Sequence, residues 1–249
     1  MRRLFPIIIF FPVLFIFSCN SAEVKTEVKL TPEQIIKKNI DSLKLLAQPG
    51  DMIARMNDNM ISLHVKNFND SDRTFSHSGI VVLKHGEKLV CNIDANEKGK
   101  DTVRYDPIDS FINPKENFIC GLFRFKISEP EKEAFLKDLD AYHDRKVHFD
   151  RRYDLATDSL IYCSEMIAKS LSRATNGRVT FKQVTTPKVM LRVMTRFFKE
   201  EAPKDMTDKA VTKVISERKY IPIDVLYLNP FCTELMRFKL KHFPGDEFE

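Results

Sequence analysis

One cysteine, Cys163, stands where a thiol would be activated as a nucleophile. It opens an apolar stripe that continues with Met166, Ile167 and Leu171, the spacing of one helix face. The stripe predicts a helix over residues 163–175 with the cysteine in its first turn. There, unpaired backbone N–H groups and the positive end of the helix dipole favour thiolate over thiol. One of these N–H groups could also bind a developing oxyanion. A small buried apolar residue would suit the same position, and most lone cysteines are of that kind.

A thiol nucleophile needs a base, and His77 is the best placed of the six histidines. The other five fall in turns, in charged loops, in an amphipathic segment or near the C-terminus. His77 begins a β-rich run, and Gly79 leaves space beside it on the same face of the strand. A histidine at the mouth of a buried strand can be held rigidly. The sequence therefore predicts a nucleophile–base pair of Cys163 and His77.

The hairpin that carries His77 also predicts a partner for the imidazole. Two β-rich runs flank a loop centred on His85 and Gly86. With that turn, Asp94 lies directly opposite His77, and Asn92 is the diagonal neighbour on the same face. A carboxylate behind the ring would orient it, as the third member of a catalytic triad does. A loop one residue longer would turn Asp94 away, so either Asp94 or Asn92 is expected to orient the ring.

Periodicity and capping signals predict the elements that must position these residues. Capping boxes start two helices, at Thr31 and at Ser128. Helices and antiparallel strands in this arrangement indicate an α+β domain. Helices are expected over residues 31–48, 128–142, 163–175 and 187–199, and strands over residues 51–55, 76–83, 88–95, 102–105, 117–126 and, as strand or loop, 220–228.

Residues 1–18 are expected to be an export signal. Two arginines precede an apolar run over residues 4–17, which is shorter than the roughly 20 residues that a membrane-spanning helix needs. The run ends next to Cys19, an arrangement similar to a bacterial lipoprotein signal, although an ordinary signal peptide with a chance cysteine fits too. We expect lipid on Cys19, a tether over residues 19–30, and anchorage in the cell envelope at a periplasmic or outer-membrane face.

Composition and motifs limit the number of domains and the classes of ligand that this chain could bind. A chain of 249 residues with 43% hydrophobic residues and a net charge of +5 suits one packed domain, here residues 31–249. No basic cluster predicts nucleic-acid binding, and no His-Glu-x-x-His or paired-cysteine motif predicts a metal or other cofactor. The four cysteines besides Cys19 could form two disulfides, but a domain of this size needs none. Residues 181–249 carry no interpretable motif and are expected to cap the site.

Several separated motifs together resemble the permuted papain-fold cysteine hydrolases, the YiiX-like branch of the NlpC-type superfamily. Ser76-His77-Ser78-Gly79-Ile80 is similar to the family's Ser-His-x-Gly-Ile, and Tyr162-Cys163-Ser164-Glu165 matches its Tyr-Cys-Ser-Glu. The opening Gly-Asp strand corresponds to residues 49–53, and the family's Glu-Ala strand to residues 93–95, with Asp94 replacing the glutamate. The acidic loop before the cysteine corresponds to residues 149–154, where Asp150 and Asp154 are expected to brace the loop. The similarity spans roughly residues 48–173.

The resemblance implies Cys163 as the nucleophile and His77 as its base. It also implies a papain-like antiparallel sheet or barrel packed against the helix that carries the cysteine. The activity it implies is thiol hydrolysis of an amide, ester or thioester through an acyl-enzyme. For an envelope-anchored enzyme, cell-wall peptide amides are the expected substrate. The alternatives are a lipid acyl hydrolase or acyltransferase, and a catalytically inactive lipoprotein that binds envelope ligands.

Overall fold

The computed structural model describes residues 30–95, 101–199 and 204–241. The chain divides into two compact units, Met1–Thr31 and Pro32–Glu249, and every helix and strand below belongs to the second. Within the described ranges, no helix has the length and apolar character to cross a membrane. The predicted export signal, Cys19 and most of the tether lie outside the described residues.

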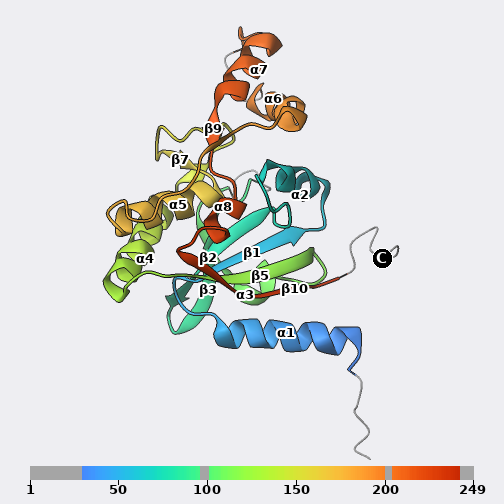
Figure 1. Ribbon diagram of the computed structural model, residues 1–249, viewed down its shortest axis with the longest axis vertical. Coiled ribbons are helices and arrows are strands. Elements are labelled where there is room, and N and C mark those ends of the chain that lie inside the picture. Colours follow the sequence, from blue (N-terminus) through green and yellow to red (C-terminus); the bar gives the residue numbers. More distant parts are fainter. Residues whose placement is uncertain (1–29, 96–100, 200–203, 242–249) are drawn as a thin grey trace, which may run out of the picture. The chain divides into compact units, whose positions relative to one another are not determined.

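Six antiparallel strands form the main sheet, in the order β10-β5-β1-β2-β3-β4 (Figure 1). The predicted α+β fold with an antiparallel sheet is confirmed. Of the two expected forms the sheet is the open one, since β10 and β4 are its two edges. The bounds of the strands are β1 Met52–Asn57, β2 His77–Lys84, β3 Glu87–Asn92, β4 Arg104–Pro107, β5 Asn117–Phe125 and β10 Cys232–Lys239.

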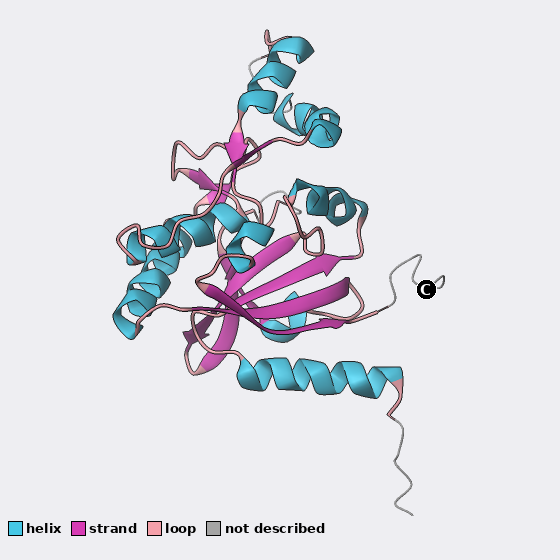
Figure 2. Cartoon of the chain, in the orientation of Figure 1, coloured by secondary structure: helices cyan, strands magenta, loops and turns pink. Residues whose placement is uncertain are grey.

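Helices cover both faces of this sheet (Figure 2). On one face, α4 and α5 pack on each other and close a core that includes Met52, Ile80 and Phe123. On the other face, a second core around Leu43 and Val81 lies under α1 and α3. The bounds of these helices are α1 Pro32–Leu46, α3 Ile108–Phe111, α4 Glu129–Asp144 and α5 Cys163–Ala174.

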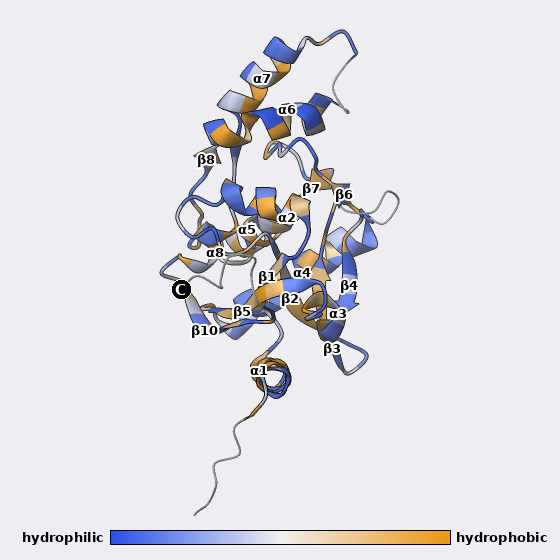
Figure 3. Ribbon diagram, turned by 90° about the vertical axis from the view of Figure 1, so that its right-hand side faces the viewer, coloured by the Kyte–Doolittle hydropathy of each residue, from blue (hydrophilic) through white to orange (hydrophobic). Residues whose placement is uncertain are grey.

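The N-terminal helix shows how the sequence pattern directs packing. In α1, Ile36, Ile40 and Leu43 recur at helical spacing and pack in the second core. Figure 3 views α1 end-on, with hydrophobic residues toward the sheet and hydrophilic residues largely on the other side. Strand β1 is buried along all six residues, as expected for a central strand covered on both faces.

The predicted hairpin forms with the predicted register. His85 and Gly86 make a two-residue turn with positive φ angles of 52° and 83°, the region that such hairpin turns require. Paired residues from Ile80↔Cys91 to Lys84↔Glu87 follow from this turn. The second strand ends earlier than expected, at Asn92 instead of residue 95. This early end decides which side chain meets His77.

The C-terminal third adds elements that the sequence pattern did not resolve. Helix α7 and edge strand β10 fall in a region of the sequence without a strong secondary-structure signal. Elsewhere, the strand expected at residues 102–105 is shifted by two residues and forms β4, Arg104–Pro107. Helices α6 and α7 pack on each other and form a third core with Phe68, Tyr162 and Tyr220. The remaining bounds are α2 Met60–Val65, η1 Lys66–Phe68, β6 His148–Phe149, β7 Leu160–Ile161, β8 Val184–Thr185, η2 Lys188–Met190, α6 Leu191–Lys199, α7 Asp208–Glu217, β9 Lys219–Tyr220 and α8 Asp224–Tyr227.

Candidate active site

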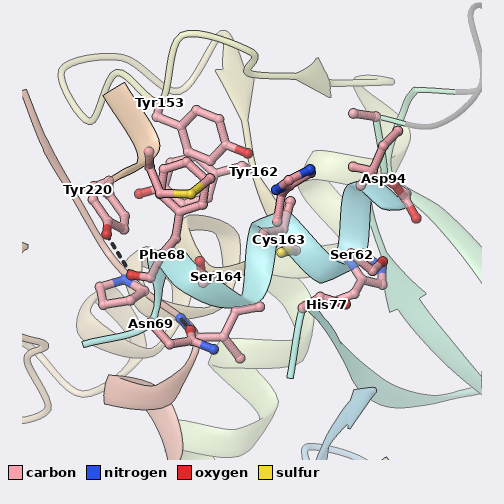
Figure 4. A pocket seen from close by; sticks show the side chains of 18 of the residues that line it. Ser62, Phe68, Asn69, His77, Asp94, Tyr153, Tyr162, Cys163, Ser164 and Tyr220 are labelled. Atoms are coloured by element: carbon pink, nitrogen blue, oxygen red, sulfur yellow. Dashed lines mark hydrogen bonds between the residues drawn. The ribbon is translucent and has the colours of Figure 1, made fainter. Parts of the chain in front are cut away.

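Cys163 is the first residue of α5, as the sequence predicts. Its side chain is buried at 8% exposure, and it lines a cavity that His77 also lines (Figure 4). The backbone N–H groups of Ser78 and Ser164 form hydrogen bonds to Sγ. Because Ser78 directly follows His77 in β2, the bond from Ser78 brings the sulfur beside the strand end that carries the imidazole. The structure thus brings together two residues that lie 86 positions apart (163 − 77).

The other residues of the Tyr-Cys-Ser-Glu motif fix the start of the helix. The hydroxyl of Tyr162 accepts a hydrogen bond from the N–H of Ile221 at 2.8 Å. The hydroxyl of Ser164 donates to the carbonyl of the same residue at 2.7 Å. The carboxylate of Glu165 accepts from the N–H of Tyr162 at 3.3 Å, which closes the first turn. The residues on either side of Cys163 are therefore fixed by bonds to the backbone of Ile221, and Glu165 fixes the first turn of the helix itself.

His77 lies at the start of β2, with its ring hydrogen-bonded by a buried amide. Its Nε2 is 3.3 Å from Oδ1 of Asn92, a side chain with no exposed surface. The other end of that amide is fixed, because Nδ2 donates to the carbonyl of Val90 at 3.2 Å and to Oδ2 of Asp106 at 2.9 Å. Oδ1 must therefore accept, and Nε2 must carry the ring proton. This tautomer leaves Nδ1 as the basic nitrogen of the imidazole.

Gly79 makes the contact between His77 and Asn92 possible. Continuing the hairpin register, Gly79 stands directly opposite Asn92. A Cβ at position 79 would lie 3.0 Å from Cβ of Asn92 and 2.5 Å from Cγ1 of Val90, closer than packed atoms allow. The space predicted beside His77 therefore exists, and the amide of Asn92 fills it.

Asp94, the predicted orienting carboxylate, lies on the same cavity and is paired with Arg55. The two side chains are largely buried, with Nη2 of Arg55 3.6 Å from Oδ2 of Asp94. The β2–β3 ladder ends at the pair Ile80↔Cys91 and β3 ends at Asn92, so the direct opposition of Asp94 to His77 is not part of the ladder. Arg55 is itself held by the carbonyl and the ring of Phe111. The geometry favours Asn92 as the orienting residue, and an orienting role for Asp94 stays a prediction.

Burial shifts the pKa values of both Cys163 and His77. It lowers the pKa of His77 to about 4, although the negative charge of Asp94 and the bond to Asn92 act in the opposite direction. Burial also raises the pKa of Cys163 to about 11, and the N–H bond from Ser78 only partly offsets this. At neutral pH the resting pair is therefore thiol and neutral imidazole. A nucleophilic role for the sulfur would therefore require transfer of its proton to Nδ1 of His77.

Alkylation of Cys163 by iodoacetamide should therefore accelerate about tenfold per pH unit from about pH 7 to about pH 10, because the thiolate is the reacting form. Replacing Asp94 by asparagine removes a charge that raises the pKa of the thiol, so the profile should move to lower pH. Peptide mass spectrometry would measure both rates. Cys91 and Cys120, whose pKa values burial also raises, serve as internal controls. A rate that is flat from about pH 5 to about pH 8 would mean a resting thiolate–imidazolium pair and contradict the neutral assignment.

The acidic loop before the cysteine has the bracing role that the sequence predicts. The buried carboxylate of Asp150 accepts hydrogen bonds from the N–H groups of Arg152 and Asp154. Asp154 in turn accepts from the N–H of Ala156. Asp150 also donates its N–H to the carbonyl of Ile161, just before the cysteine helix. The loop is thereby tied to the strand that delivers Cys163.

Three contributions to the site carried no signal in the sequence. Arg55 comes from β1 and Asp106 from β4. The backbone of Ile221, which bonds Tyr162 and Ser164, comes from a segment without a motif. Each acts through a contact between residues far apart in the chain, and only the fold reveals it. The four cysteines of the described chain are all free thiols, so the two disulfides that the sequence allowed do not form.

A comparison with models of protein families finds no match for this chain, and none of the curated proteins matches either. Among solved structures, YiiX from Escherichia coli O157:H7 is similar, with a TM-score of 0.58 and 18% sequence identity. The alignment covers 77% of this chain and 98% of YiiX.

YiiX is described as a metalloprotein of DUF1105. Within residues 30–95, 101–199 and 204–241 of the present chain, no three His, Cys, Asp or Glu side chains lie together as a metal site would require. These residues therefore do not fit a metal centre. At 18% identity, the likeness extends to the fold alone. The chain has a YiiX-like fold.

Proposed function

We propose that this protein is a cysteine hydrolase that works through an acyl-enzyme. The observation that carries the proposal is the arrangement around His77, whose buried hydrogen bond to Asn92 leaves Nδ1 as the basic nitrogen of a ring that lines the same cavity as Cys163. Cys163 lies at a helix start, where its sulfur is held by backbone N–H groups. A nucleophile, a base and an orienting amide are the three roles that such hydrolysis requires.

The proposed reaction has two steps. Sγ of Cys163 forms a bond to the carbonyl carbon of the substrate, and its proton moves to Nδ1 of His77. The bond from that carbon to the leaving nitrogen, oxygen or sulfur breaks, and the leaving group takes the proton from His77. Water then attacks the thioester with His77 as base, which releases the carboxylic acid and restores the thiol. The backbone N–H of Cys163 is the proposed donor to the oxyanion.

An envelope anchor on Cys19 is part of this proposal and rests on the sequence alone. An enzyme held on a membrane surface would meet both cell-wall peptide amides and lipid acyl groups. The lining of the cavity is therefore the feature that distinguishes these two substrate classes. A ligand-binding protein without turnover is the remaining alternative.

Trapping of the acyl-enzyme tests the proposal directly. The full-length chain in digitonin is incubated with a panel of activated esters and with muropeptides, then denatured and digested. We expect an acyl adduct on the peptide that contains Cys163, and its loss in Cys163→Ala. The matched control is Cys232→Ala, which removes another buried free thiol and should keep the adduct. If no member of the panel acylates Cys163, the protein is a binder and the hydrolase proposal is wrong.

A further inference from the structure

The cavity at Cys163 has two chemically different ends. In Figure 4, His77, Ser62 and Asp94 lie on one side of Cys163, and Phe68 and Tyr220 lie on the other. The cavity has a volume of about 350 Å³. It therefore extends well beyond the space that a single peptide bond would need at the sulfur.

The end away from His77 is lined by aromatic and methionine side chains. The ring of Phe68 stacks on Tyr153 with centroids 5.8 Å apart and meets Tyr220 edge-on at 5.4 Å. Helices α2 and α6, with η2 between β8 and α6, complete the wall with four apolar side chains that pack in the same core as Phe68 and Tyr220. These are Val65, Met190, Val193 and Met194.

Three of the polar groups at this end are already bonded within the protein, and the hydroxyl of Tyr153 is the polar atom that remains there. The hydroxyl of Tyr220 donates to the carbonyl of Phe68 at 2.5 Å, and the hydroxyl of Tyr162 is bonded to Ile221. Both ends of the Asn69 amide are used, since Nδ2 donates to Phe75 and Oδ1 accepts from Ile223. What this end offers to a ligand is therefore mainly ring faces, methyl groups and thioethers.

Buried polar atoms without a protein partner are found near the reacting end instead. The hydroxyl of Ser76, next to His77, lines the cavity and has no hydrogen-bond partner among the described residues. A peptide lying along the apolar end would bury an amide at every residue without partners, which is costly. A hydrocarbon chain has no such groups, and it gains by leaving water.

We propose that the substrate of this site is a medium-length linear acyl chain, attached as an ester or amide, with its carbonyl at Cys163 and its tail against Phe68, Met190 and Met194. The inference rests on the proposed cysteine hydrolase and names its substrate class. A methylene is similar in size to a water molecule, which occupies about 30 Å³, so the cavity holds roughly ten methylene groups. The product is then a free medium-chain fatty acid, released when water cleaves the thioester.

A chain-length series tests this inference. p-Nitrophenyl esters from acetyl to palmitoyl are hydrolysed by the full-length chain in digitonin, which has no flexible alkyl tail. We expect kcat/KM to rise about 100-fold from acetyl to octanoyl or decanoyl, because each buried methylene adds to binding. It should fall again for palmitoyl, whose tail exceeds the cavity.

Variants then tie the length preference to this wall. Met194→Trp should shorten the preferred chain and lower the decanoyl-to-acetyl ratio of kcat/KM about tenfold. Val193→Phe fills less of the cavity and should change the ratio in the same direction. It replaces Met194→Trp as the test if the tryptophan variant does not fold. The matched control is Val189→Trp, at a residue that is 69% exposed beside Met190, and it should keep the wild-type ratio.

The possible outcomes distinguish failure of the acyl-chain inference from failure of the proposed cysteine hydrolase. If an acyl adduct forms on Cys163 but acetyl and decanoyl esters react equally, or a muropeptide amide reacts faster than both, the acyl-chain inference is wrong and the hydrolase stands. An unchanged ratio in both Met194→Trp and Val193→Phe would also refute it. If no substrate acylates Cys163, the hydrolase itself fails.

Discussion

Replacing Cys163 by alanine should lower kcat/KM for the best ester substrate about 10⁴-fold, and His77→Ala should cost a similar factor. The thiol has a pKa raised to about 11, so it is protonated at neutral pH and attacks only when a base takes its proton. In the proposed mechanism, His77 supplies that base as a neutral imidazole. Because neither residue works without the other, the double variant should be no slower than the slower single variant. Steady-state kinetics on the full-length chain would measure all three.

Two controls separate loss of chemistry from loss of structure. Cys232→Ala removes a buried free thiol in β10, and His148→Ala removes a histidine with 58% of its side chain exposed. Both should keep kcat/KM within about twofold, since surface and remote changes usually have small effects. Losses that add up across Cys163 and His77 would show that the two residues act independently, which would contradict a nucleophile–base pair.

Local sequence signals predict much of what positions these two residues. The turn at His85 and Gly86 sets the hairpin register, because a two-residue turn fixes which residues face each other. The spacing from Cys163 to Met166, Ile167 and Leu171 sets the buried face of α5 and places the cysteine at its start. In both cases the information lies within about a dozen residues of the functional group.

The sequence predicts Asp94 and Asn92 as candidate partners of His77, but it could not decide between them. Register alone favours Asp94, the directly opposed residue. The structure instead brings in Asn92, because Gly79 leaves room for the diagonal amide and Asp106 of β4 fixes its orientation. Arg55, from a strand on the other side of β2, pairs with the carboxylate of Asp94. These preferences depend on four strands at once, and no single stretch of sequence contains them.

The cavity at Cys163 is also a product of contacts between residues that are far apart in the chain. Its apolar wall joins α2, which precedes the hairpin, to α6, which follows the cysteine helix by more than a dozen residues. The segment at Ile221 is bonded to Tyr162 and Ser164 through its backbone, so its side-chain identities carry little signal. Composition shows many phenylalanines, but most of those whose side chains the structure describes are buried in the core. The cavity could therefore be recognised only from the assembled fold.

Replacing Asn92 by alanine should lower kcat about 100-fold with little change in KM, whereas Asp94→Asn should cost less than about fivefold. Oδ1 of Asn92 accepts a hydrogen bond from Nε2–H of His77 and so keeps Nδ1 as the basic nitrogen of the ring. Without this bond the ring can adopt the other tautomer or rotate, which affects the chemical step more than substrate binding. Asp94 acts on the ring through its charge, and Arg55 already offsets much of that charge.

Asn117→Ala is the matched control for the loss of a buried amide. Asn117 is also fully buried and donates to two backbone carbonyls, but it makes no bond to His77. It should lower the thermal midpoint as Asn92→Ala does while keeping kcat within a few-fold, because removing a buried hydrogen bond costs about 1–3 kcal/mol of stability. If Asp94→Asn proves the more damaging change and Asn92→Ala is mild, the opposed carboxylate orients the imidazole. The carboxylate of Asp94 would then orient His77, and the bonds of Asn92 to His77 and Asp106 would not determine which ring nitrogen is basic.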